Sequence, residues 1–276
     1  MIVKTAGKAR RFCFGLKIFM LKKKKYPIIE FDVDRKAVIN PDACFKRIKG
    51  FPEHGVICFL GDTIQKLKDA GKLKEIYVVR SICTRYPVYQ LTFKGKKVLL
   101  FNPYVGAPSA AGLMEEIGAA GCTKWISCGA AGVLDKRISV GHLIVPKSAV
   151  RDEGTSYHYL KPSREVAASP RALKAIRRTL DKHGVPYLVS RTWTTDGFFR
   201  ETPAKIALRK KEGCLAVEME AAAILAVAKF RGYHAGTILY GCDDVSGKDW
   251  DTRRTHDRAY IQEKILWLAV EACLAI

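Results

Sequence analysis

From residue 56 to the C-terminus, the chain alternates between two patterns of hydrophobic and polar positions. Short apolar runs, typical of buried strands, are separated by glycine-bearing turns and by stretches in which apolar residues recur at helical spacing. The runs predict strands over residues 56–60, 76–80, 88–93, 97–101, 124–128, 142–146, 187–193, 215–217 and 236–241. The helical spacing predicts helices over residues 109–120, 170–183, 203–212, 218–230 and 255–274. Strands that alternate with helices favour an α/β domain in which helices cover a central sheet.

The first 25 residues differ from the rest of the chain in charge. They contain nine Lys and Arg residues and no Asp or Glu, and the whole chain of 276 residues has a formal net charge of +21. We expect residues 1–25 to form a disordered basic extension. Residues 26–276 contain no linker or repeat, so we expect them to form one domain.

Apolar segments and cysteines exclude several classes of protein. No apolar run approaches the roughly 18 residues that a membrane helix needs, so we expect no membrane association. Nine cysteines are scattered along the chain, mostly within apolar runs, and no Cys or His pair has the short spacing of a structural zinc site. This usage is typical of reduced, buried thiols, and it predicts a cytoplasmic protein without a metal.

The basic charge leaves a nucleic-acid-binding protein as an alternative function. However, the charge is concentrated in the extension, and no RNA- or DNA-binding motif accompanies it. We therefore expect no specific nucleic-acid partner. A protein that still bound RNA tightly at physiological salt after deletion of residues 1–25 would favour the alternative.

Three predicted strands end in residues that could carry chemistry. A glycine-bearing loop over residues 129–132 follows one strand; its backbone N–H groups could bind a ligand, or the loop could be only a tight strand exit. Glu218, Met219 and Glu220 follow a second strand. These acids could favour the start of a helix, or a carboxylate could bind the vicinal hydroxyls of a ribose beside the methionine. Asp243 follows a third strand, where it could close a turn or act as a general acid.

Two further segments combine aromatic and polar residues. Phe198 and Phe199 lie directly after a strand and a turn, where they could fill the core or stack on a heterocycle. Residues 151–159 contain two tyrosines and His158, in a loop that could be solvated or could contact a ligand.

Taken in order, these segments resemble the nucleoside phosphorylase family, which contains uridine phosphorylase, bacterial purine nucleoside phosphorylase and the methylthioadenosine nucleosidases. The resemblance runs from about residue 61 to the C-terminus, and its most specific motif is VEMEA at residues 217–221, which is similar to the family's ribose-binding signature. It implies a three-layer α/β/α fold with a central mixed sheet. It also implies homodimers or homohexamers in which neighbouring subunits help to close each site.

The resemblance assigns roles to single residues. It implies cleavage of the N-glycosidic bond of a ribonucleoside, with Asp243 as the acid that protonates the leaving base, and His158 as a contact to the sugar or to a neighbouring subunit. The other implied contacts are Glu218, Met219 and Glu220 for the ribose, and Phe198 and Arg200 for the base. These residue types suit a reaction that passes through an oxocarbenium-like sugar.

The base preference stays open at this point. Asp243 is typical of the purine enzymes, because the pyrimidine members lack an acid at that position. Residues 151–159 are more similar to uridine phosphorylase. The glutamine and arginine that bind uracil have no clear counterpart after Phe199, where only Arg200 and Glu201 are available.

The resemblance also leaves the nucleophile open. The phosphorylases place arginines at the positions of Gln65 and Ser127 and a hydroxyl residue at that of Ala130, so three phosphate ligands are missing. The nucleosidases activate water with a carboxylate near Gly61, where this chain lacks the acidic run. We expect phosphorolysis, narrowly ahead of hydrolysis, with phosphate as co-substrate and no cofactor. The residues available on the phosphate side are Gly61, Lys66, Arg80, Arg85 and Gly129.

Overall fold

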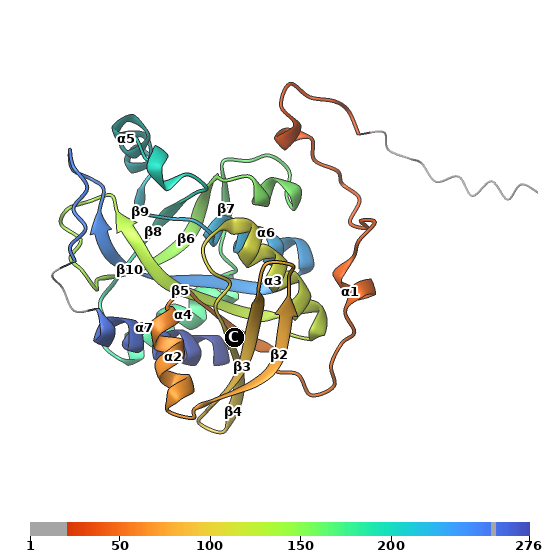
Figure 1. The fold of residues 1–276 in the computed structure, drawn as a ribbon. Coiled ribbons are helices and arrows are strands. Elements are labelled where there is room, and N and C mark those ends of the chain that lie inside the picture. The colour runs from red at the N-terminus through yellow and green to blue at the C-terminus, as the bar shows by residue number, and fades with distance from the viewer. Residues whose placement is uncertain (1–20, 255–257) are drawn as a thin grey trace, which may run out of the picture.

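A mixed ten-stranded sheet organises the part of the chain that the computed structural model describes, residues 21–254 and 258–276 (Figure 1). Its strands are β1 (His54–Cys58), β2 (Leu73–Arg80), β3 (Arg85–Phe93), β4 (Lys96–Phe101), β5 (Lys124–Val133), β6 (Leu143–Asp152), β7 (Glu165–Ala167), β8 (Tyr187–Thr195), β9 (Cys214–Glu218) and β10 (His234–Asp244). Neighbouring strands follow the order β10-β6-β8-β9-β5-β1-β4-β3-β2, and β7 pairs with β6. β1 pairs in parallel with β4 and β5, whereas β2, β3 and β4 pair antiparallel, which confirms the predicted mixed sheet.

One half of the sheet closes on itself. β10 pairs with both β6 and β5, and β5 is connected to β6 again through β9 and β8. These five strands form a ring in which every strand has two neighbours, so none of them presents an open edge. The last residues of β5 pair with the last residues of both β9 and β10, so three strand ends meet at one place.

Helices cover both faces of the sheet. The α-helices are α1 (Pro41–Cys44), α2 (Gly61–Asp69), α3 (Ala107–Ala120), α4 (Pro170–Lys182), α5 (Pro203–Lys211), α6 (Ala221–Arg231) and α7 (Ala259–Leu274), and the short 3-10 helices are η1 (Pro27–Ile29), η2 (Thr155–His158) and η3 (Phe198–Arg200). α4 packs beside α7 on one face, and α3 packs beside α6 on the other (Figure 1). This arrangement confirms the expected three-layer α/β/α fold.

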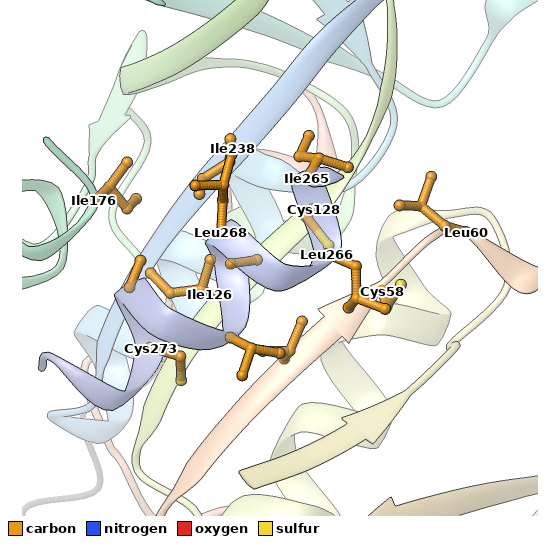
Figure 2. Close-up of a cluster of buried hydrophobic side chains, with 14 of the residues drawn as sticks. Cys58, Leu60, Ile126, Cys128, Ile176, Ile238, Ile265, Leu266, Leu268 and Cys273 are labelled. Carbon is orange, nitrogen blue, oxygen red and sulfur yellow. The ribbon is translucent and has the colours of Figure 1, made fainter. Parts of the chain in front are cut away.

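Each face of the sheet has its own hydrophobic core. Figure 2 shows Leu266 and Leu268 of α7 in one cluster with Ile126 of β5 and Ile238 of β10, and all four side chains are buried. On the opposite face, α6 is buried along residues 221–228, and five of these eight residues are alanines. Because alanine side chains are short, this helix can pack closely against the strands that carry the candidate site.

Residues 21–53 run along the outside of the domain and form little regular structure beyond η1 and α1 (Figure 1). Arg35 attaches this segment to α6: its guanidinium donates a hydrogen bond to the carbonyl oxygen of Phe230 and lies 4.7 Å from the centre of that ring. Most of the predicted basic extension, residues 1–20, lies outside the described residues. Residues 21–25 are exposed and form neither helix nor strand.

Three elements differ from the sequence predictions. β5 continues through residues 129–132, predicted as a loop, because β9 and β10 pair with it there. α2 lies in a segment for which no helix was predicted, and it buries Ile64 and Leu67 on the inner side of an otherwise polar helix. β7 has only three residues, too few to produce a recognisable pattern.

Membrane and metal signals are also absent from the described part of the chain. No helix there is long and apolar enough to cross a membrane. No group of three or more His, Cys, Asp or Glu side chains is placed to hold a metal ion. The eight cysteines within the described ranges are free thiols, and six of them are buried.

Candidate active site

The candidate site lies where the ends of β5, β9 and β10 meet. Gly132 of β5 pairs with Val217 of β9, and Ala131 pairs with Gly241 of β10. A Cβ atom on Gly132 would lie 3.0 Å from Val217 Cγ1 and 3.6 Å from Asp243 Oδ2. A side chain at this position would crowd β9, so the glycine permits the close approach of the strands that bear the acidic residues.

Two adjoining pockets open at this junction. The first, here called the outer pocket, has a volume of about 500 Å³; its walls include Phe198, Phe199, Glu201, Asp243 and Trp250. The second, the inner pocket, has a volume of about 230 Å³; its walls include Phe59, Ser127, Gly129, Glu220 and Thr237. Ala130, Glu218 and Met219 line both pockets. A ligand could therefore place one part in each pocket, with the bond between the parts beside Met219.

Glu218, the last residue of β9, has its carboxylate occupied by internal hydrogen bonds. Its Oε2 accepts from the backbone N–H groups of Glu220 (2.8 Å) and Ala221 (2.6 Å), and its Oε1 accepts from Thr194 Oγ1 at 2.6 Å. Burial raises the pKa of Glu218, and these hydrogen bonds oppose the shift. The Glu218 side chain therefore fixes the first backbone N–H groups of α6. It thereby positions Met219, which lines both pockets, and Glu220, which lines the inner pocket.

Glu220 lies at the wall of the inner pocket. It is the N-cap residue of α6, it is 7% exposed, and its Oε1 accepts a hydrogen bond of 2.6 Å from the backbone N–H of Gly106. Burial, and next the negative charge of Glu218, raise the pKa of Glu220 to about 8. A carboxylate oxygen can accept more than one hydrogen bond, so Glu220 retains capacity for ligand hydroxyls.

Asp243 is the acid that β10 brings to the outer pocket. Its Oδ2 accepts a hydrogen bond of 2.7 Å from the indole Nε1 of Trp250, which also lines the pocket. The neighbouring Asp244 instead forms an ion pair with Arg253 at 2.9 Å and accepts from the backbone N–H of Ser246. The alternation of side chains along the end of β10 thus gives the two adjacent aspartates different surroundings.

The aromatic segment after β8 forms one side of the outer pocket. The rings of Phe198 and Phe199 have centroids 4.0 Å apart, and both residues are more than half exposed. Glu201 lines the same pocket, and burial together with the charge of Asp243 raises the pKa of Glu201 to about 7. Arg200, the expected base contact, is exposed and is not among the residues that line either pocket.

The residues expected on the phosphate side are not brought together within the described chain. Gly129 lines the inner pocket, but Lys66 and Arg80 are exposed and line neither pocket. Arg85 is also exposed, and its guanidinium lies 3.5 Å from the carboxylate of Glu75. Gly61 begins α2, where a Cβ atom would lie 3.3 Å from the Asn102 amide.

The loop over residues 151–163 is held together by contacts of one of its own residues, Arg151. The buried guanidinium of Arg151 lies 4.3 Å from the centre of the Tyr157 ring. It donates hydrogen bonds to Ser156 Oγ, Ser163 Oγ and the carbonyl oxygens of Leu160 and Lys161. His158 is exposed at the end of η2 and does not line either pocket.

Several residues that line the pockets were not identified from the sequence. Trp250 follows a turn rich in Gly and Asp, and only the fold brings it back to Asp243. Ser127 and Thr237 lie on neighbouring strands with their hydroxyl oxygens 2.8 Å apart in the wall of the inner pocket. Glu201 was noted beside Arg200, but no local pattern distinguished which of the two would line the pocket.

Comparison with known proteins agrees with this architecture. The family model described as "Phosphorylase superfamily" matches residues 53–274. The chain is 28% identical over 153 residues to guanosine phosphorylase of Halorubrum lacusprofundi, a match that covers 55% of this chain and 64% of that protein. It is 29% identical over 188 residues to the DeoD-type purine nucleoside phosphorylase of Colwellia psychrerythraea, which covers 67% of this chain and 80% of that one.

Solved structures share the fold. Uridine phosphorylase from Vibrio fischeri superposes with a TM-score of 0.68 at 24% identity, over 83% of this chain and 94% of that one. Purine nucleoside phosphorylase from Toxoplasma gondii, in complex with immucillin-H, superposes with a TM-score of 0.69 at 19% identity, over 80% of this chain and 90% of that one. The family match spans the sheet, both helical layers and both pockets, and the chain therefore belongs to the phosphorylase superfamily.

Proposed function

We propose that this protein cleaves the N-glycosidic bond of a ribonucleoside, with the sugar in the inner pocket and the base in the outer pocket. The observation that carries the proposal is the junction of the two pockets at Met219, with Glu220 on the inner side and Asp243 on the outer side. The reaction needs a carboxylate near the sugar and an acid near the base, and this arrangement supplies one on each side of the bond.

On the sugar side, Glu220 would bind the vicinal hydroxyls of the ribose. Charge-assisted hydrogen bonds of this kind are among the stronger polar contacts that proteins make. As the glycosidic bond breaks, the sugar becomes positively charged. A positive charge near Glu220 would favour its ionised form, which burial disfavours. The carboxylate would thus interact more strongly with the transition state than with the substrate.

On the base side, Phe198 and Phe199 would contact the face of the heterocycle, and Asp243 would donate a proton to the departing base. Protonation makes the base a better leaving group. The indole of Trp250 donates to Asp243 Oδ2, which orients the carboxyl group and leaves Oδ1 for the base. Asp243 supports a purine as the substrate, because a purine has a ring nitrogen, N7, that can accept this proton.

For the nucleophile, we propose inorganic phosphate, since the relatives are named guanosine, purine nucleoside and uridine phosphorylases. Hydrolysis is a second candidate, and one observation favours it. Among the described residues that line the inner pocket, two are carboxylates and none is Lys or Arg. A phosphate ion would therefore need a cationic partner from another part of the assembly or from a movement of the chain.

Incubation of the purified protein with inosine, adenosine or uridine, with and without phosphate, tests both candidates. A phosphorylase releases base only with phosphate and forms ribose 1-phosphate. Release of base at the same rate without phosphate, together with free ribose, would identify a hydrolase. If no nucleoside is cleaved under either condition, the proposed reaction is wrong.

We also propose a homodimer or homohexamer in which a second copy covers the pocket mouth. Val105 lines the inner pocket and is 69% exposed, and the adjacent Tyr104 is 56% exposed. Exposed apolar residues beside a pocket are typical of a protein interface. Sedimentation analysis of the full chain tests this assembly, and a monomer at micromolar concentration would contradict it.

A further inference from the structure

Residues 26–35, here called the N-terminal strap, precede the region that the family model matches, which begins at residue 53. The strap contains η1 and forms no other regular structure. It nevertheless lies along the domain, where η1 packs beside η2 of the loop over residues 151–163 (Figure 1). The strap therefore makes contacts with the domain that the family match does not include.

The first contact of the strap is made by Ile28, at the start of this loop. The backbone N–H of Gly154 donates to Asp196 Oδ2 at 2.8 Å, which ties the loop to the end of β8. A Cβ atom on Gly154 would lie 3.8 Å from both Asp196 Oδ2 and Ile28 Cδ1. The apolar side chain of Ile28 thus lies beside the hydrogen bond and limits the access of water to it, which strengthens the bond.

Asp196 connects this contact to the outer pocket. It directly follows β8, and Phe198 and Phe199, which line the pocket, come two and three residues later. The backbone N–H of Arg200 donates to the carbonyl oxygen of Gly197 at 2.8 Å and closes this turn. The position of Asp196 therefore sets where the turn that carries the two aromatic rings begins.

The second contact is made by Arg35, at the other end of the strap. Its guanidinium donates to the carbonyl oxygen of Phe230 in the last turn of α6, where helix carbonyls lack intrahelical partners. It also lies 4.7 Å from the centre of the Phe230 ring. Tyr159 of the loop meets the same ring edge-on, with the ring centroids 5.6 Å apart. Arg35 thus fixes the ring against which the loop packs.

Between these two contacts, the strap spans a pocket of about 520 Å³. The walls of this pocket include Phe31 and Val33 of the strap and Lys161 and Pro162 of the loop. Because the pocket separates the middle of the strap from the loop, we expect the contacts at the two ends to hold the strap in place.

We propose that Ile28 and Arg35 are positioning residues, which hold the loop over residues 151–163 and the aromatic wall of the outer pocket in the conformation that binds the nucleoside. This inference rests on the proposed function, and it adds a segment outside the family match. Neither residue lines the outer or the inner pocket, so both act through other residues. A looser wall spends less time in the binding conformation, and the apparent affinity falls with that fraction. Saturating substrate restores the binding conformation, so KM should rise while kcat changes little.

The kinetic test compares the full-length protein with its Ile28→Ser and Arg35→Gln variants. We expect KM for the best nucleoside substrate to rise about 5- to 20-fold in each, with kcat within about 2-fold of wild type. Ile28→Leu and Arg35→Lys, which keep the apolar contact and the donor, should return KM to within about 3-fold of wild type. Val38→Ser and Lys36→Gln are the matched controls; both residues are exposed in the same part of the chain, and their replacement should change neither constant.

Hydrogen exchange tests the same contacts without a substrate. Ile28→Ser should raise the exchange rate of the Gly154 amide about 10-fold, because its hydrogen bond to Asp196 opens more often. Arg35→Gln should raise the exchange rate of the Tyr159 amide by a similar factor. The control variants should leave both rates unchanged.

A double variant tests whether Ile28 acts through Asp196. Asp196→Ala removes the acceptor of the Gly154 amide, so the further addition of Ile28→Ser should raise KM by less than about 2-fold. Effects of the two substitutions that multiply in full would contradict this route.

Three outcomes would overturn the inference. These are unchanged KM and exchange rates in Ile28→Ser and Arg35→Gln, equal effects of Ile28→Ser and Val38→Ser, and a fall in kcat at constant KM. Failure of the proposed function would look different, because wild type would then cleave no nucleoside. In that event, the exchange rates decide: faster exchange in the two variants alone supports the role of the strap, and unchanged exchange overturns it.

Discussion

Glu220 and Asp243 illustrate how the surroundings of a residue decide the chemistry of a carboxyl group. Glu220 is buried beside a second carboxylate, and the pKa of Glu220 is raised to about 8. Asp243 lies on the wall of the larger pocket, and a tryptophan indole donates to it. In the proposed reaction, Glu220 would respond to positive charge on the sugar, and Asp243 would transfer a proton to the base.

Replacing Glu220 by Gln should lower kcat/KM, because the amide cannot supply the negative charge that the proposed transition state requires. We expect the loss to correspond to an increase of about 2–4 kcal/mol in the activation free energy. Steady-state kinetics with the best nucleoside substrate measures this loss, and circular dichroism verifies the fold. The assignment of Glu220 to the ribose fails if the variant is as active as wild type.

Replacing Asp243 by Asn should slow cleavage of inosine by about two to four decades, because the amide has no acidic proton to donate. A nucleoside whose base leaves without protonation, such as 7-methylguanosine, should lose far less. Equal losses on both substrates would show that Asp243 supports the structure instead of donating a proton.

At the scale of elements, the loop after β6 depends on one buried cation. Arg151 is 4% exposed, and its guanidinium binds four oxygen atoms of residues 156–163, which fold this loop over α6. Desolvation lowers the pKa of Arg151, which reflects the cost of burying its charge. Tyr159 and Leu160 of the loop pack against the hydrophobic core, and the hydrogen bonds of Arg151 hold the polar part of the loop in place.

Arg151→Met should lower the free energy of unfolding by about 3 kcal/mol, because several buried carbonyl and hydroxyl oxygens lose their donor. Arg164→Met is the matched control. Arg164 is 59% exposed, where its guanidinium pairs with Glu212, and its replacement should cost less than about 1 kcal/mol. Urea unfolding curves give both values, and similar losses in the two variants would contradict this account of the loop.

At the scale of the whole molecule, the buried carboxyl groups of the candidate site make the free energy of unfolding depend on pH. The pKa values of Glu201 and Glu220 are raised to about 7 and about 8, from an ordinary value of 4.5. The folded protein therefore holds protons that the unfolded chain releases above pH 4.5. The stability associated with these protons is complete below pH 4.5 and is lost as the pH rises through 7 and 8. His54, whose pKa is lowered from its ordinary value of 6.5 mainly by desolvation, acts in the opposite direction below pH 6.5.

The free energy of unfolding should thus fall on the order of 2 kcal/mol between pH 6 and pH 8.5, a value reduced for the partial exposure of Glu201. The double variant Glu201→Gln/Glu220→Gln should show a smaller fall. Urea unfolding at several pH values measures both slopes. A wild-type stability that rises over this interval would contradict the raised pKa values.

The sequence by itself determined the order of most elements and the residues at the ends of three strands. Apolar runs and helical spacing are local properties, so the nine predicted strands and five predicted helices are all present, with shifted ends. The motif around Glu220 was recognisable because a strand, two acids and an alanine-rich helix are adjacent in the chain.

Only the tertiary structure decided how these parts combine. The pairing of β10 with β5 closes the ring and turns a predicted glycine loop into a strand. Arg200 and Glu201 are adjacent in the chain, yet Glu201 lines the outer pocket and Arg200 is exposed. Glu218 and Glu220 are two residues apart, yet one is occupied by internal hydrogen bonds and the other lines the inner pocket. These outcomes depend on contacts between residues distant in the sequence, and no local pattern encodes such contacts.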